Sequence, residues 1–174
     1  MCVIIYKPKG ASLPSKDVLA ACRLANPHGQ GFASESDFYK SIQYSSFIKR
    51  LQGVRKEENC IIHFRFATHG SIKLSNCHPF VKSGTAFAHN GVLDIMPIGD
   101  KTDSETAFLL RILPTIKQYG LHSVELDRVI YDMIGYSRFA LMQGGDVRLF
   151  GTFYEYNGCY FSNMRFLRYN SHFC

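Results

Sequence analysis

The sequence lacks any apolar run close to the roughly 18 residues that a membrane-spanning helix needs. Its first residues also lack the basic segment and longer apolar core of a secretory signal peptide. Charged residues make up 20% of the chain and hydrophobic residues 46%, a composition that argues against disorder. These features predict a cytoplasmic protein, bacterial or viral, with no membrane association.

Closely spaced cysteine pairs are missing as well. The six cysteines are far apart, and none forms a C-x-x-C pair. Without a signal peptide, this spacing argues against a disulfide framework. A zinc site from Cys22, His28, Cys77 and His78 would lack the usual close pairing of ligands. We therefore expect neither a metal site nor a cofactor.

Clusters of basic residues are also absent, although the net charge is +6 and the pI is about 9.0. Such a charge is compatible with nucleic-acid binding. The lysines and arginines are scattered, however, and no run interleaves them with aromatic side chains. This distribution favours a solvated basic surface, so we do not expect a nucleic-acid partner.

Local signals predict one α+β domain spanning residues 1–174. Ser15, Thr102 and Ser123 are each placed to start a helix, and Thr102 begins a capping box. The Gly-Gly of "MQGGDV" and the Asn-Gly of "EYNGCY" lie between strand-forming runs, which predicts two hairpins. Other strands are expected at 3–6, 31–34, 38–42, 60–65 and 85–89, and a helical turn at 46–51. Strands followed by helices and again by strands predict antiparallel sheets with helices packed outside.

Cys2 is the first candidate for chemistry. If Met1 is removed, Cys2 carries a thiol and a free α-amine, with ordinary pKa values of about 8.5 and about 7.7–8.0. A nucleophile and its base then belong to one residue, which is a recognised way to activate a weak nucleophile. The alternative is a chance cysteine before a buried strand.

A second candidate group follows the strand predicted at 60–65. Arg65 ends this strand, and its planar guanidinium matches a carboxylate. Thr68 and His69 follow at once, where Gly70 allows a sharp turn. Taken alone, the stretch also fits a polar loop with a surface arginine.

Two more candidates lie further along the chain. Asn90-Gly91 fits a type I′ hairpin turn, but an Asn amide beside a Gly N–H also supplies two donors for a developing oxyanion. Asp103 fits a helix N-cap, or a carboxylate that binds a substrate ammonium.

Four motifs, taken in order along the chain, resemble the glutaminase domain of the class II glutamine amidotransferases. They are a second-position Cys, Arg-x-x-Thr-His-Gly, His-Asn-Gly and Asp-Ser-Glu. These are N-terminal nucleophile hydrolases. The resemblance runs from Cys2 to about Asp103 and continues more loosely to "GCYFSN". It implies a four-layer αββα sandwich of two antiparallel sheets. The chain departs from the family at Val3, where Gly is usual, and at "NPHGQGFA", where an Arg-Gly motif is frequent.

The resemblance implies catalytic roles for three residues. Cys2 is expected to be the nucleophile, with its α-amine as the base. Asn90 and Gly91 are expected to form the oxyanion hole. In "NPHGQGFA", the positions Asn26, His28 and Gln30 are open to a pocket role or a structural one.

It also implies how L-glutamine is bound. Arg65 is expected to hold the α-carboxylate and Asp103 the α-ammonium, while Thr68 and His69 shape the pocket. A zwitterionic head group needs one cation and one anion, and this set supplies both. About a dozen residues separate Asn90 from Asp103, fewer than in larger members of the family.

The function expected from the resemblance is hydrolysis of the glutamine side-chain amide by a stand-alone glutaminase-type domain. The chain leaves no length for a synthase domain, so a separate synthetase or ligase is the expected user of the ammonia. Two alternatives remain: hydrolysis of another γ-glutamyl amide by the same machinery, and a non-catalytic binding module that kept the fold.

Overall fold

The computed structural model describes residues 2–67 and 71–169. One sheet contains β1 (Val3–Lys7), β2 (Gln30–Ser34), β3 (Phe38–Ser41), β4 (Cys60–Phe64), β9 (Tyr154–Tyr156) and β10 (Cys159–Phe161). The other contains β5 (Phe80–Lys82), β6 (Thr85–Asn90), β7 (Arg138–Gln143) and β8 (Asp146–Phe150). The strand orders are β3-β2-β4-β1-β10-β9 and β5-β6-β7-β8, and every pairing is antiparallel.

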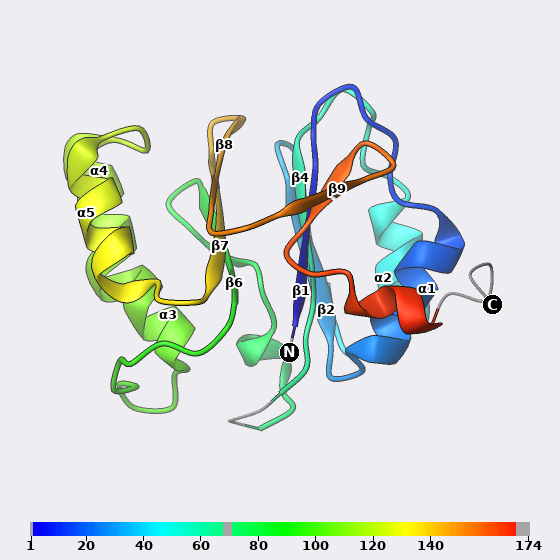
Figure 1. The fold of residues 1–174 in the computed structure, drawn as a ribbon, viewed down its shortest axis with the longest axis horizontal. Coiled ribbons are helices and arrows are strands. Elements are labelled where there is room, and N and C mark those ends of the chain that lie inside the picture. The colour runs from blue at the N-terminus through cyan, green and yellow to red at the C-terminus, as the bar shows by residue number, and fades with distance from the viewer. Residues whose placement is uncertain (1, 68–70, 170–174) are drawn as a thin grey trace.

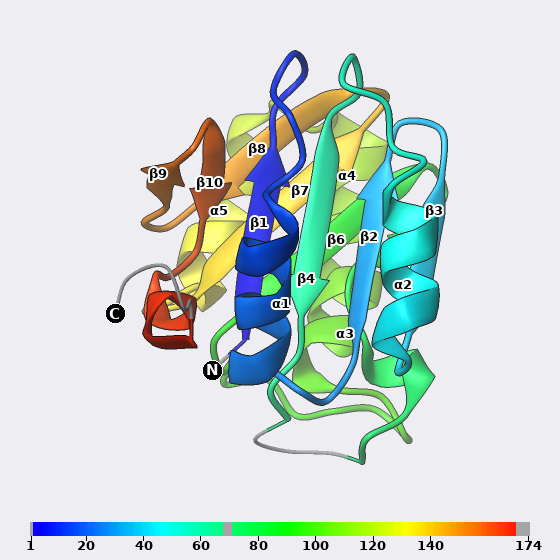
Figure 2. The same ribbon diagram turned by 90° about the vertical axis from the view of Figure 1, so that its right-hand side faces the viewer.

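Helices cover the outer face of each sheet, so the fold has the four layers of an αββα sandwich (Figure 1). On the larger sheet lie α1 (Lys16–Ala25) and α2 (Tyr44–Leu51), which face the viewer in Figure 2. On the smaller sheet lie α3 (Asp103–Ala107), a π-helical stretch (Phe108–Ile112), α4 (Leu113–Tyr119) and α5 (Val124–Met133). The α+β sandwich expected from the resemblance is confirmed.

The three predicted helix starts are confirmed. The hydroxyls of Ser15, Thr102 and Ser123 each accept a hydrogen bond from the main-chain N–H three residues further on. Such caps satisfy donors that the first helical turn leaves free. Because Thr102 takes this role, the interpretation of Asp103 as the N-cap is wrong: Asp103 is the first helical residue.

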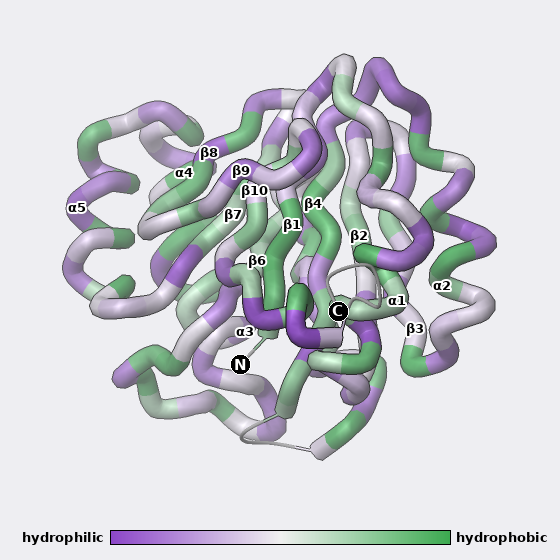
Figure 3. Tube along the Cα trace, turned by 45° about the vertical axis from the view of Figure 1, so that its right-hand side comes forward, coloured by the Kyte–Doolittle hydropathy of each residue, from purple (hydrophilic) through white to green (hydrophobic). Residues whose placement is uncertain are grey.

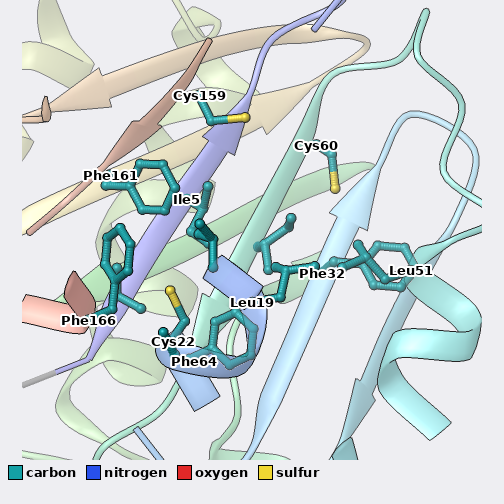
Figure 4. Packing of buried hydrophobic residues seen from close by; sticks show 14 of the residues in the cluster. Ile5, Leu19, Cys22, Phe32, Leu51, Cys60, Phe64, Cys159, Phe161 and Phe166 are labelled. Atoms are coloured by element: carbon teal, nitrogen blue, oxygen red, sulfur yellow. The ribbon is translucent and has the colours of Figure 1, made fainter. Parts of the chain in front are cut away.

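Side-chain alternation along β1 separates two cores. Val3 and Ile5 pack under α1 and α2, in the cluster that Figure 4 shows from close by, whereas Ile4 faces the other sheet. The hydrophobic colour of β1 and β4 in Figure 3 reflects burial on both faces. The cluster between the sheets is rich in alanine and consists of Ile4, Ala33, Ile61, Ala86, Ala88, Ala140 and Met142.

Both predicted hairpins are confirmed, and one predicted turn is not. Gly144-Gly145 joins β7 to β8, and Asn157-Gly158 joins β9 to β10, all four residues having positive φ. Asn90-Gly91 is not a hairpin turn, because β6 ends at Asn90 and pairs with β5 and β7. The three-residue edge strand β5 was not expected, because it lies in a segment that reads as a polar loop.

Strand register brings distant parts of the chain together at one end of the sandwich. Val3 pairs with Phe64, so the start of β1 lies beside the end of β4. Ile5 pairs with Phe161, which places Ser162 opposite Ile4. The start of β1 lies at this end of the sandwich in Figure 1. None of the helices described has the length and apolar character needed to cross a membrane.

Candidate active site

A cavity of about 410 Å³ opens at this end of the sandwich. Its lining includes four of the residues singled out from the sequence: Cys2, Arg65, Gly91 and Asp103. They come from the start of β1, the end of β4, the end of β6 and the start of α3. The fold therefore places a thiol, a guanidinium, a glycine N–H and a carboxylate around one space.

Cys2 is held against the segment that follows β4. Its Sγ accepts a hydrogen bond from the main-chain N–H of Phe66 at 3.3 Å and lies 3.6 Å from the Phe66 carbonyl oxygen. Burial raises the pKa of the Cys2 thiol, while the Phe66 hydrogen bond and the Arg65 charge act in the opposite direction. Because burial dominates, the thiol needs a base to become a nucleophile at neutral pH.

Arg65 is buried in the cavity wall and is 5% exposed, so the interpretation as a surface arginine is wrong. One Nη donates to the carbonyl of Ser71 at 3.1 Å. The Arg65 main chain bonds to residues 28 and 29 through its carbonyl and its N–H. Thr68 and His69, predicted to shape the same pocket, lie outside the described residues.

His28 holds this segment from the β2 side. Its Nδ1 accepts the main-chain N–H of Ala67 at 2.9 Å, and the main-chain N–H of His28 donates to the Arg65 carbonyl at 2.9 Å. The ring also packs against Phe66, with centroids 5.1 Å apart. The structure therefore favours the structural role for His28 over the pocket role.

The carboxylate of Asp103 is fixed by three donors. Oδ2 accepts the N–H of Leu93 at 2.9 Å, and Oδ1 accepts the N–H and the hydroxyl of Ser104 at 2.7 and 3.1 Å. The Ser104 hydroxyl has one hydrogen, so His89 Nδ1, 2.7 Å away, must donate to it. This network of hydrogen bonds holds the Asp103 carboxylate in one orientation at the cavity wall.

Gly91 lines the cavity, whereas Asn90 does not. Gly91 lines the cavity with φ +151°, and a Cβ there would collide with Ser137. Asn90 is 1% exposed and is not among the described lining residues. Its Nδ2 donates to Ser162 Oγ at 2.8 Å. Gly91 thus borders the cavity, whereas the amide of its neighbour Asn90 is buried against Ser162.

Three buried histidines lie beside the cavity, on β4, on β6 and before β5. The rings of His63 and His78 are 4.5 Å apart, and those of His78 and His89 are 6.3 Å apart. Burial lowers the pKa of His63 to about 3 and of His89 to about 4, and places that of His78 well below its ordinary value. These imidazoles are therefore uncharged at neutral pH.

Several contacts at the site were not anticipated from the sequence. They involve Phe66, Ser104, Ser162 and Asn163, none of which was assigned a role from the sequence. The signal that came nearest was the late stretch "GCYFSN", to which the family resemblance extends only loosely. Among the residues described, no group of three or more His, Cys, Asp or Glu side chains is placed to hold a metal ion.

Residues 33–140, more than half of the chain, match the family model of the class-II glutamine amidotransferases. The chain belongs to this family. Matches to individual relatives are shorter. A protein of Haemophilus influenzae named "Putative glutamine amidotransferase" is 41% identical over 66 residues, covering 30% of this chain and 22% of the relative.

The glutamine–fructose-6-phosphate aminotransferase (isomerizing) of Rhizobium leguminosarum bv. viciae is 31% identical over 75 residues, which is 37% of this chain and 12% of that protein. This chain thus matches less than a quarter of the length of either curated relative.

Solved structures support the fold of this class-II glutamine amidotransferase. The glutamine phosphoribosylpyrophosphate amidotransferase of B. subtilis superposes with a TM-score of 0.60 at 16% identity, covering 92% of this chain and 41% of the other. A structure described as the allosteric regulatory enzyme of purine biosynthesis gives 0.57 at 15% identity, with the same coverage. The predicted family and the αββα fold are confirmed, and membership in this family supports an enzyme.

Proposed function

We propose that this chain hydrolyses the side-chain amide of L-glutamine through Cys2, after removal of Met1. The observation that carries the proposal is the shared cavity, where a thiol, a buried guanidinium and a fixed carboxylate meet. Arg65 binds the α-carboxylate of glutamine, and Asp103 binds its α-ammonium. This pairing leaves the side-chain amide to reach toward Cys2.

The reaction proceeds in two steps that use the same groups. The α-amine of Cys2 takes the thiol proton, and the sulfur attacks the amide carbon. The oxyanion of the tetrahedral intermediate is stabilised by the N–H of Gly91 and by the Asn90 amide. The C–N bond then breaks, and the amine's proton leaves with the nitrogen as ammonia. Water cleaves the resulting γ-glutamyl thioester, which releases glutamate and restores the thiol.

We further propose that the ammonia is used by a separate synthetase or ligase. Glutamine hydrolysis that ends in free ammonia is wasteful, so an acceptor enzyme is the natural user. This part of the proposal concerns the partner and does not alter the chemistry at Cys2.

The test uses protein whose first residue is Cys2. It is assayed in parallel with two substrates, L-glutamine and γ-glutamyl methylamide. Glutamate and the released amine are measured for each, with Cys2→Ala as the blank. Faster release from glutamine supports the proposal. Faster release from the methylamide would indicate a hydrolase of other γ-glutamyl amides. No glutamate from either substrate, together with salt-dependent binding to DNA, would indicate a binding module instead.

A further inference from the structure

Two polar residues after β10 contact both halves of the proposed catalytic machinery. Asn163 Nδ2 donates to the main-chain carbonyl of Cys2 at 2.8 Å, across 161 positions of the sequence. Ser162 Oγ accepts the Asn90 amide at 2.8 Å. We propose that Ser162 and Asn163 are positioning residues, which hold the oxyanion donor and the nucleophile in register across the two sheets.

Ser162 is suited to this role because it is fully buried and joins both sheets. Its hydroxyl also accepts the N–H of Ile4 at 2.9 Å, and its own N–H donates to the Ile4 carbonyl at 2.9 Å. Ile4 belongs to β1, in the larger sheet, whereas Asn90 ends β6 in the smaller one. One oxygen atom therefore links the strand that carries Cys2 to the strand that carries Asn90.

Ser162 leaves one amide hydrogen of Asn90 for the proposed contact with the oxyanion. The amide nitrogen of Asn90 carries two hydrogens, and Ser162 accepts one of them. Ser162 does not use the second, which is the hydrogen that the proposed mechanism assigns to the oxyanion. A buried amide held at one hydrogen cannot rotate freely, so Ser162 keeps this donor preorganised, and preorganisation is what makes such a donor effective.

Asn163 acts on the other partner of the reaction. Its Oδ1 accepts the N–H of Arg165 at 3.1 Å, which orients the amide so that Nδ2 faces the Cys2 carbonyl. Cys2 lies next to the first residue of the sequence, and terminal main-chain positions fray readily. The Asn163 contact anchors its main chain from one side while the N–H of Phe66 holds its sulfur from another.

This inference rests on the proposed function, and a double-mutant cycle tests it. Ser162→Ala should lower kcat for glutamine by about ten- to a hundredfold, less than loss of the donor itself, with KM changed less than about twofold. In the Asn90→Ala background the same change should cost less than about twofold, because Ser162 acts through Asn90. Equal losses of kcat in both backgrounds would overturn the role of Ser162. If Ser162→Ala does not fold, the cycle uses Ser162→Cys.

Ser123→Ala is the matched control. It also removes a serine that accepts a main-chain N–H, but at the start of α5 and away from the cavity. It should lower thermal stability and leave kcat unchanged. A comparable fall in kcat for Ser123→Ala would mean that stability alone explains the Ser162 effect.

Asn163 is tested by a readout that does not depend on glutamine. Asn163→Ala should slow alkylation of Cys2 by iodoacetamide at pH 8 several-fold, because the thiol leaves the Phe66 N–H that favours its charged form. An unchanged rate would overturn the role of Asn163. A wild-type protein that releases no glutamate contradicts the proposed function, whereas this alkylation test still decides the Asn163 part of the inference.

Discussion

The main-chain N–H of Phe66 lies 3.3 Å from Cys2 Sγ, although 64 positions separate the two residues. The antiparallel pairing of β1 with β4 produces this contact, because it sets the start of one strand beside the end of the other. The sulfur of this half-buried residue therefore has one donor facing it. This environment makes the base that removes the thiol proton decisive for activity.

The first prediction concerns the nucleophile. Cys2→Ser should leave the fold intact, because the side chains are nearly isosteric, and should lower glutamine hydrolysis by several orders of magnitude, since a serine hydroxyl is the poorer nucleophile. Cys159→Ser is the control: its Sγ lies 3.5 Å from a main-chain carbonyl that a hydroxyl can also reach, so activity should persist. Near wild-type turnover in Cys2→Ser would reject Cys2 as the nucleophile.

The second prediction concerns processing of the N-terminus. When Met1 is retained, the nitrogen of Cys2 is an amide and cannot accept a proton, so this form should be almost inactive. Cysteine is small enough at the second position for methionine aminopeptidase to remove Met1. Intact mass spectrometry measures the fraction of molecules that begin at Cys2, and glutaminase activity should rise in proportion to it. If a homogeneous Met1-retaining preparation were as active as protein that begins at Cys2, the α-amine mechanism would be wrong.

The third prediction concerns the oxyanion donor. Asn90→Ala should lower kcat by about 10²–10³-fold and change KM little, because the donor matters once charge develops on the substrate oxygen. Steady-state kinetics with glutamine measure both constants. Asn59→Ala, at the far end of β4, is a matched control and should leave kcat unchanged. A rise in KM at constant kcat would assign Asn90 to ground-state binding instead.

The fourth prediction concerns recognition of the α-carboxylate. Arg65→Lys should raise KM about tenfold or more, since a point charge replaces a planar fork and also loses the bond to Ser71. The control is Arg50→Lys, because Arg50 pairs with Asp37 at the surface. Its KM should match that of the wild type. If Arg65→Lys instead lowered kcat alone, the carboxylate-binding role would be wrong.

The fifth prediction concerns acid stability. His63 and His89 have folded-state pKa values of about 3 and about 4, whereas an unfolded histidine titrates near 6.5. Between these values the unfolded state binds more protons, so the free energy of unfolding should fall as the pH falls from about 6.5 to about 4. At about 1.4 kcal/mol per pKa unit, the loss is on the order of a few kcal/mol for each of the two histidines. Urea titrations across this range measure it.

Two variants make the acid prediction specific. His78→Phe removes a buried ring whose two nitrogens have no hydrogen-bond partner among the described residues, and should reduce the pH dependence. His122→Gln changes an exposed ring and should leave the slope as in the wild type. A pH dependence that is the same in all three proteins would show that the His78 ring does not contribute to it.

Much of the secondary structure follows from short-range chemistry, so the sequence predicted it. Ser15, Thr102 and Ser123 start helices because a hydroxyl there can satisfy main-chain donors of the first turn. The Gly-Gly and Asn-Gly turns form hairpins because their residues accept positive φ. Local chemistry misled at Asn90-Gly91, which has the composition of a turn although Asn90 ends a strand.

The sequence by itself also determined which side chains could do chemistry, since a thiol beside the chain start, an arginine, an Asn-Gly pair and an aspartate are visible as residue types in order. Only the tertiary structure decided that Cys2, Arg65, Gly91 and Asp103 share one cavity and that Asn90 is buried outside its lining. It also decided that Ser162 and Asn163 reach the site. These contacts depend on strand register between segments up to 161 positions apart, and no local pattern encodes that distance.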